Sequence, residues 1–254
     1  MRLYLSPTLK ILAIGDSHTA TFSKNINFEY SSLPDFNVTV KAIKMASARG
    51  LSTGSPTTNS VAIIDANLDV LGMPDYLCLN FGQVDAEFGF YYKTILKREP
   101  LDFEQYSTKI VQAYVQACDK YKSRTKALVI KGINLPTISS RNRATFSVAR
   151  QIGVIGRHST YNKSFAKRLV KRIESRLPEY SERCARVRFF NGILQKECNK
   201  YDISYFDING EIFDETNNTI RPEFLPVSSL DHHVALTAKV SEFCISKLLA
   251  TSNI

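Results

Sequence analysis

The 254-residue chain lacks several features that would assign it to a class of proteins at once. No apolar run approaches the roughly 20 residues that cross a bilayer, so no membrane span is expected. The apolar run in the first residues is too short for a signal peptide, and we therefore expect a cytoplasmic protein. Neither Gly-x-x-x-x-Gly-Lys nor Gly-x-Gly-x-x-Gly occurs, which argues against a phosphate- or nucleotide-binding loop.

Cysteine and histidine are both scarce. The five cysteines are odd in number and scattered, and no Cys-x-x-Cys occurs, so neither a disulfide framework nor a cysteine zinc site is indicated. Cys78, Cys118 and Cys244 lie in apolar patterns and are expected to be buried as small hydrophobic residues. Only four histidines are available for acid–base chemistry.

Acidic residues are in deficit, which leaves a formal net charge of +9. The excess is concentrated between Arg141 and Arg188. The simplest interpretation of this excess is a solvated helix face. The more specific interpretations are that it contacts an anionic glycan, a nucleic acid or a membrane surface. No nucleic-acid-binding motif is present, so a nucleic-acid partner is not expected.

What the chain does contain is an alternation of short apolar strands and amphipathic helices. Strands are predicted at residues 11–14, 36–43, 76–81, 126–130 and 203–208, and helices at 58–70, 101–120, 161–177, 187–200 and 233–250. This order predicts one domain over residues 1–254, a flavodoxin-like three-layer α/β/α sandwich of about five mostly parallel strands. Residues 137–160 show no strong periodicity and are interpreted either as a lid or specificity insertion or as a solvated connection.

The first strand stops abruptly at Gly15-Asp16-Ser17-His18. Gly15 permits a tight turn, and Ser17 would then lie at the carboxyl end of a strand, where open α/β sheets bind their ligands. A helix beginning there would direct backbone N–H groups toward an oxyanion formed beside a nucleophilic serine. The alternative is a plain strand-to-helix turn in which Asp16 or Ser17 is the N-cap.

A serine nucleophile needs a general base. His18 is adjacent to Ser17, and neighbouring side chains diverge, so it is a poor base; His158 lies in an Arg-rich stretch that disfavours protonation. Asp231-His232-His233 places an acid beside histidines before the last predicted helix, which is an arrangement that orients an imidazole. The alternative is an N-cap aspartate with two surface histidines.

Four short blocks, in order along the chain, resemble the SGNH (GDSL-type) hydrolase superfamily of esterases and acyl hydrolases. The blocks are Ile14-Gly15-Asp16-Ser17-His18, Ala46-Ser47-Ala48-Arg49-Gly50-Leu51, Phe81-Gly82-Gln83-Val84-Asp85 and Asp231-His232-His233. Each block alone is a weak signal, but four in the family's order at predicted strand ends form a stronger one.

The resemblance implies a role for each matching residue. Ser17 would attack an ester carbonyl, His233 would take its proton, and Asp231 would hold His233. The N–H groups of Ser17 and Gly50 would bind the oxyanion. Supporting roles would fall to Asp16, which fixes the turn, and to Gly82, Asp85 and His232. No metal or cofactor is implied.

The sequence departs from the family pattern at two places. Val84 stands where the family has an oxyanion-stabilising asparagine, so either Gln83 or Asn80 substitutes for it or the donor is missing. The aspartate precedes His233 by two residues rather than three. Either Asp231 still reaches that histidine, or the base is His232, or the site works as a Ser–His dyad.

The sequence therefore predicts a serine hydrolase that cleaves an O-acyl ester on a small molecule or a carbohydrate. Two other functions stay open. The same site could transfer an acyl group to a glycan alcohol, or the chain could be a catalytically degenerate binding protein of the same fold. The two departures are what favours the binding protein.

Overall fold

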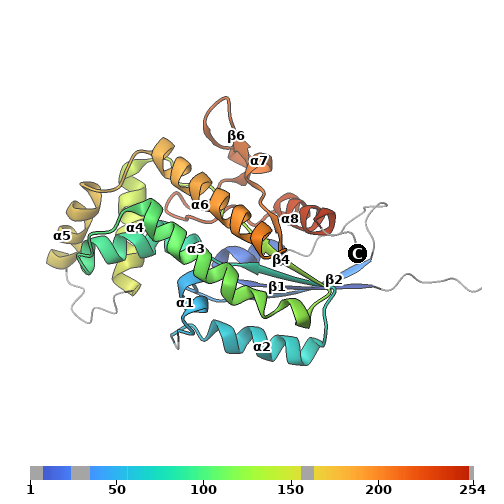
Figure 1. Cartoon of the computed structure of the whole chain (residues 1–254). Helices are drawn as coiled ribbons and strands as arrows, with labels where there is room; N and C mark the ends of the chain where they lie inside the picture. Colours follow the sequence, from blue (N-terminus) through green and yellow to red (C-terminus); the bar gives the residue numbers. More distant parts are fainter. Residues whose placement is uncertain (1–7, 24–34, 56, 156–162, 252–254) are drawn as a thin grey trace, which may run out of the picture.

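The computed structural model describes residues 8–23, 35–55, 57–155 and 163–251, and it is built around one parallel sheet (Figure 1). The strands are β1 (Leu9–Gly15), β2 (Phe36–Ala42), β3 (Tyr76–Asn80), β4 (Ala127–Lys131) and β5 (Ser204–Phe206). Their order is β2-β1-β3-β4-β5, and all pairs are parallel. The flavodoxin-like α/β architecture predicted from the sequence is confirmed.

The central strands are buried because almost every residue in them is apolar. Ile11, Leu12, Ala13 and Ile14 of β1 are at most 1% exposed, and all of β3 is buried. Such strands lie inside a sheet that is covered on both faces. Figure 1 shows α2 (Ser60–Leu71) and α8 (Ala238–Ala250) on opposite sides of the sheet. All five cysteines are free and buried, as expected for Cys78, Cys118 and Cys244.

The remaining helices pack around these layers. α3 (Phe103–Asp119) packs against both α1 (Ala48–Ser52) and α6 (Tyr180–Lys200), α4 (Arg141–Ile155) packs against α5 (Lys163–Glu174), and α8 packs against the 3-10 helix η1 (Ser17–Phe22). η2 (Asp85–Gly89) and η3 (Tyr92–Leu96) are π-helical turns, and η4 (Lys122–Arg124) and η5 (Pro222–Phe224) are 3-10 turns. No helix in the described ranges is both long enough and apolar enough to cross a membrane.

The structure differs from the prediction in the expected insertion and at the ends of some helices. Residues 141–155 form α4 instead of an irregular connection, because Ala144, Val148 and Ile152 recur at a helical spacing and are buried. The last helix begins at Ala238, not at 233, because Thr237 caps it through the Val240 N–H. Residues 156–160 of the expected insertion lie outside the described residues.

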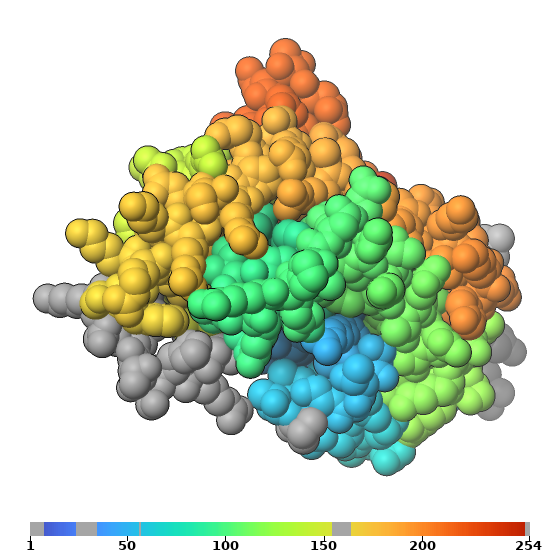
Figure 2. Space-filling model, turned by 60° about the vertical axis from the view of Figure 1, so that its left-hand side comes forward, coloured from blue at the N-terminus to red at the C-terminus, as the bar shows by residue number. Residues whose placement is uncertain are grey.

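One further unit was not predicted. α7 (Asn209–Ile212) leads into a two-stranded antiparallel pair, β6 (Phe213–Asp214) and β7 (Thr219–Ile220). Figure 2 shows this part of the chain, in orange-red, as a protrusion from the body. Strands of two residues carry too little pattern to be recognised in a sequence.

Candidate active site

Ser17 lies at the carboxyl end of β1, where the strand order reverses between β2 and β3. Doubly wound sheets place their ligands at this edge. The Asp16 carboxylate caps η1 by accepting the His18 N–H at 2.9 Å. Gly15 is required for a close approach rather than for a special turn conformation, because a Cβ there would overlap the Asn80 carbonyl oxygen of β3. These contacts hold the partly exposed Ser17 hydroxyl at the sheet edge.

A chain of two short hydrogen bonds joins Ser17, His233 and Asp231. His233 Nε2 lies 2.7 Å from Ser17 Oγ, and His233 Nδ1 lies 2.6 Å from Asp231 Oδ1. An ionised carboxylate only accepts hydrogen bonds, so Nδ1 carries the proton and Nε2 is free to accept the Ser17 hydroxyl hydrogen. The geometry is that of a nucleophile, a base and a group that orients the base.

The short Asp–His spacing is accommodated by the loop that precedes α8. The His233 backbone N–H donates to Asp231 Oδ1 at 3.0 Å, so the same oxygen receives both the backbone and the ring of His233. Partial burial acts to raise the pKa of Asp231, but the backbone and ring of His233 outweigh it and hold the pKa below its usual value. Asp231 therefore stays ionised at neutral pH.

His232 lies in a different environment from His233. Its ring packs edge-on against Phe88, with the ring centroids 5.0 Å apart. Burial and the neighbouring His233 lower the pKa of His232 to about 4, so it is neutral at pH 7. Among the described residues, the ring that meets the Ser17 hydroxyl belongs to His233. His158 lies outside the described residues.

Two of the three expected oxyanion donors are committed elsewhere. The Gly50 N–H donates to the Ser47 hydroxyl at 2.9 Å, because Ser47 is the N-cap of α1. The Gln83 amide donates to Glu87 Oε1 at 2.8 Å and to the Asn134 carbonyl at 2.9 Å, while its oxygen accepts the Asn134 N–H at 2.8 Å. The Gln83 side chain therefore does not supply the missing donor, and instead ties the end of β3 to the loop after β4.

Asn80, the other substitute considered, is also engaged, because its amide donates to the Lys131 carbonyl at 3.3 Å. Val84 is buried, and its side chain has no polar group. Ser17 itself occupies the first position of η1, and the first N–H groups of a helix have no partner inside it. The Ser17 N–H is thus the one expected donor that the local backbone leaves available.

The supporting residues build the frame around this edge. Asp85 Oδ2 accepts the Ala48 N–H of α1 at 2.7 Å, although burial raises the pKa of Asp85 to about 7. Burial likewise raises the pKa of Asp16 to about 7. Gly82 has φ 121°, and a Cβ there would press on the Phe190 ring. Asp85 therefore fixes α1 against the turn after β3.

A hollow lies between η2, α4 and α6, and His232 is one of its lining residues. Its lining is mostly apolar: Ala86, Phe88, Tyr91, Phe103, Pro136, Ile138, Ala144, Val148, Leu177 and Val187. Six polar side chains also line it: Glu87, Thr137, Ser147, Arg183, Arg186 and His232. Arg183 donates to the Ile138 and Ser139 carbonyls, and burial raises the pKa of Glu87 to about 8. No local sequence pattern reveals this hollow, because its residues come from four separate segments.

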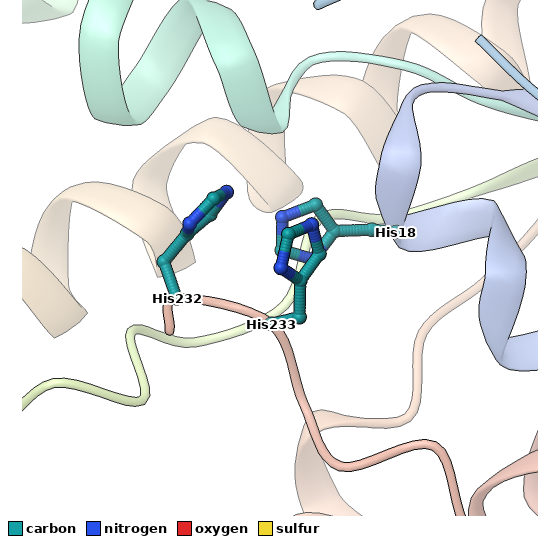
Figure 3. Close-up of side chains that lie close together, drawn as sticks. All are labelled: His18, His232 and His233. Atoms are coloured by element: carbon teal, nitrogen blue, oxygen red, sulfur yellow. The ribbon is translucent and has the colours of Figure 1, made fainter. Parts of the chain in front are cut away.

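His18 is the other residue whose surroundings the sequence did not reveal. It is 2% exposed, and its ring centroid lies 4.4 Å from that of His233 and 5.2 Å from that of His232. Burial and the two neighbouring histidines lower the pKa of His18 well below its usual value. Figure 3 shows the three rings gathered between η1 and the loop before α8.

Comparison with protein-family models gives no match, and a search of curated proteins also gives none. Solved structures do match over nearly the whole chain. A mutant of Axe2, an acetyl-xylooligosaccharide esterase from Geobacillus, superimposes with a TM-score of 0.54 at 11% identity, covering 97% of this chain and 94% of that one. A catalytic mutant of Axe2, described as an acetylxylan esterase from Geobacillus stearothermophilus, gives 0.53 at 11% identity and 94% of each chain.

LAE5, an alpha/beta hydrolase enzyme from the metagenome of Lake Arreo in Spain, gives a TM-score of 0.50 at 12% identity, covering 96% of this chain and 97% of that one. The chain shares the fold of these esterase and hydrolase structures. At 11–12% identity the likeness establishes the fold alone. What this chain does has to be argued from its own side chains.

Proposed function

We propose that this chain is a serine esterase that hydrolyses O-acyl esters. The observation that carries the proposal is the hydrogen-bonded chain Ser17–His233–Asp231 at the carboxyl end of β1. An ionised Asp231 fixes the His233 tautomer whose Nε2 can accept a proton. A structural N-cap role for Asp231 would not need the His233 ring to meet a serine 216 residues away.

In the proposed reaction, Ser17 Oγ attacks the ester carbonyl carbon while its proton passes to His233 Nε2. The negative charge that develops on the carbonyl oxygen is stabilised by the Ser17 N–H. His233 then returns the proton to the leaving alcohol, and water cleaves the acyl-enzyme by the same route in reverse. Because Val84 has no side-chain donor and the Gly50 N–H is engaged by Ser47, this site works with two donors fewer, and the loss of each donor costs roughly 100- to 1,000-fold in rate.

The substrate class follows from the hollow beside His232. Its apolar walls suit the acyl part of an ester, so we propose an acyl group larger than acetyl. The alcohol part is proposed to be a small molecule or a carbohydrate, which is supported by the fold shared with an esterase described as acting on acetylated xylo-oligosaccharides.

A second candidate function is ester binding without turnover. The observation that favours it is that the Gly50 N–H and the Gln83 amide, two of the three expected oxyanion donors, are engaged in other hydrogen bonds. A binding protein of this kind would keep the hollow and lose measurable catalysis.

A fluorophosphonate probe separates the two functions, because it reacts with an activated serine whatever the substrate. The wild-type chain is labelled beside Ser17→Ala, with folding of both checked by circular dichroism. We expect labelling of the wild type that disappears in the variant. A folded wild type that is not labelled would reject the esterase and support the binding protein.

A further inference from the structure

Three imidazoles that are far apart in the sequence converge beside the proposed nucleophile. One ring nitrogen from each of His18, His232 and His233 lies within 4.8 Å of the other two (Figure 3). His18 is almost fully buried, and neither of its ring nitrogens has a hydrogen-bond partner among the described residues. Buried polar groups without a partner are rare in native proteins because their desolvation is not compensated, so His18 needs an explanation.

We propose that His18, His232 and His233 form an inhibitory site for a Zn²⁺-type divalent ion. Neutral imidazole is a preferred ligand of Zn²⁺, and three histidines with one open position are an established ligand number. Coordination would satisfy one buried nitrogen of His18. Asp231 would keep its hydrogen bond to His233 Nδ1 when the ion binds. A carboxylate on the second nitrogen of a ligating histidine fixes the ring and makes it a stronger ligand.

The rings need only a small rearrangement to close on an ion. Zn–N distances of about 2.1 Å place tetrahedral ligand atoms about 3.4 Å apart, so the separation of up to 4.8 Å must shrink by about 1.4 Å. The adaptable partners are His232 and His233, which lie in the loop before α8 and are only partly buried. His18, held by η1 and the Asp16 cap, is the fixed ligand.

The ion and Ser17 compete for the same atom. His233 Nδ1 is bonded to Asp231, so the ion has to take Nε2, which otherwise accepts the Ser17 hydroxyl hydrogen. With Nε2 occupied, Ser17 keeps its proton and has no base. Coordination forms a metal–nitrogen bond, breaks the Ser17–His233 hydrogen bond and involves no redox change. The inhibition rests on the proposed esterase function, whereas the binding does not.

Binding is tested by isothermal titration of the full chain, stripped of metal, with ZnCl₂. We expect one ion per chain for the wild type and no binding of Mg²⁺, which prefers oxygen ligands. His18→Ala and His232→Ala should each weaken Zn²⁺ binding by at least about tenfold, because losing even an outer-shell partner costs that much. Ser17→Ala removes the competitor and should bind Zn²⁺ at least as tightly as the wild type. Circular dichroism checks that each variant folds.

The outcomes are distinguishable from those of the esterase test. Absence of Zn²⁺ binding in the wild type, or unchanged binding in folded His18→Ala and His232→Ala, would overturn the site. If His18→Ala does not fold, His232→Ala and the visible absorption of bound Co²⁺ decide the matter, because a tetrahedral histidine site gives a spectrum that His232→Ala should abolish. Zn²⁺ binding with the expected variant pattern in a chain that no fluorophosphonate labels would keep this site and reject the esterase.

Discussion

His232 and His233 are adjacent in the sequence, yet their surroundings give them different chemistry. His233 is placed between a carboxylate and a hydroxyl, whereas His232 packs on Phe88 and lines the apolar hollow. A ring whose Nδ1–H is held by a carboxylate can accept the proton of a hydroxyl group at Nε2. The His232 ring, which packs against an apolar neighbour, instead forms part of the wall of the hollow.

Alanine at these two positions should therefore have unequal effects. We expect His233→Ala to lower kcat for an ester by at least about 100-fold, because general base catalysis is lost, and His232→Ala to lower it much less. Asp231→Ala should fall between them, since Asp231 is 41% exposed in its side chain and water partly replaces it. Steady-state kinetics measure all three, and a larger loss in His232→Ala than in His233→Ala would contradict the assignment.

Glu87 should make the stability of the fold depend on pH. Burial raises its pKa from 4.5 to about 8, so between these values the folded state holds a proton that the unfolded state has lost. The free energy of unfolding therefore falls as pH rises from about 5 to about 8. Glu87→Gln copies the neutral form and keeps an oxygen for the Gln83 amide.

Relative to the wild type, Glu87→Gln should thus gain stability as the pH rises from 5 to 9. Urea denaturation at several pH values measures the difference, and comparing the two curves cancels titrating groups that do not interact with Glu87, such as Asp85. A difference that is constant with pH would show that Glu87 is already ionised in the folded protein.

At the scale of the elements, sequence periodicity located the five sheet strands and most of the long helices. Buried strands such as β1 and β3 are continuous apolar runs, and α3 carries an apolar stripe with Asp102 as its cap. The beginning of α8 was misplaced because the apolar Val234 and Leu236 continue the helical pattern backward. The hydrogen bond of Thr237 to Val240, which sets the boundary, competes with that pattern.

α4 should control the length of the acyl group, since it forms one wall of the hollow. Ala144 faces the hollow and is 4% exposed. We expect Ala144→Phe to fill part of the space and to lower kcat/KM for a long acyl ester by at least about tenfold, because burial of several CH₂ groups is lost. The acetyl ester should change little.

A p-nitrophenyl ester series from acetyl to octanoyl measures this change, with Phe146→Ala as the matched control. Phe146 lies on the same helix but is 58% exposed, so its removal should leave the chain-length profile unaltered. Equal losses for acetyl and octanoyl esters in Ala144→Phe would show that the hollow does not bind the acyl group.

At the scale of the whole molecule, the position of the site was predictable and its detail was not. Parallel strands bring their carboxyl ends to one edge, so Ser17 and the turn after β3 had to be neighbours. Hydrogen bonds between distant segments decide which donors remain free. Examples are the bond from the Gln83 amide to the Asn134 carbonyl and the bond from the Ala48 N–H to the Asp85 carboxylate, and no local sequence pattern predicts either bond. The cluster of His18, His232 and His233 depends in the same way on the packing of η1 against the loop before α8.

The net charge of +9 should influence which esters reach the site. Arg183 and Arg186 line the hollow, and the exposed Lys171 and Arg172 lie on α5, which packs against its α4 wall. A positive surface attracts anionic substrates over about 10 Å at 0.1 M salt, and added salt screens the attraction.

We expect kcat/KM for an anionic ester to fall several-fold from low to high salt, while that of a neutral ester of the same acyl group stays constant. Lys171→Glu combined with Arg172→Glu should flatten the salt dependence, because both side chains are exposed and removable without loss of packing. If the two esters respond to salt alike, the charge excess does not act on the substrate and serves as a solvated helix face.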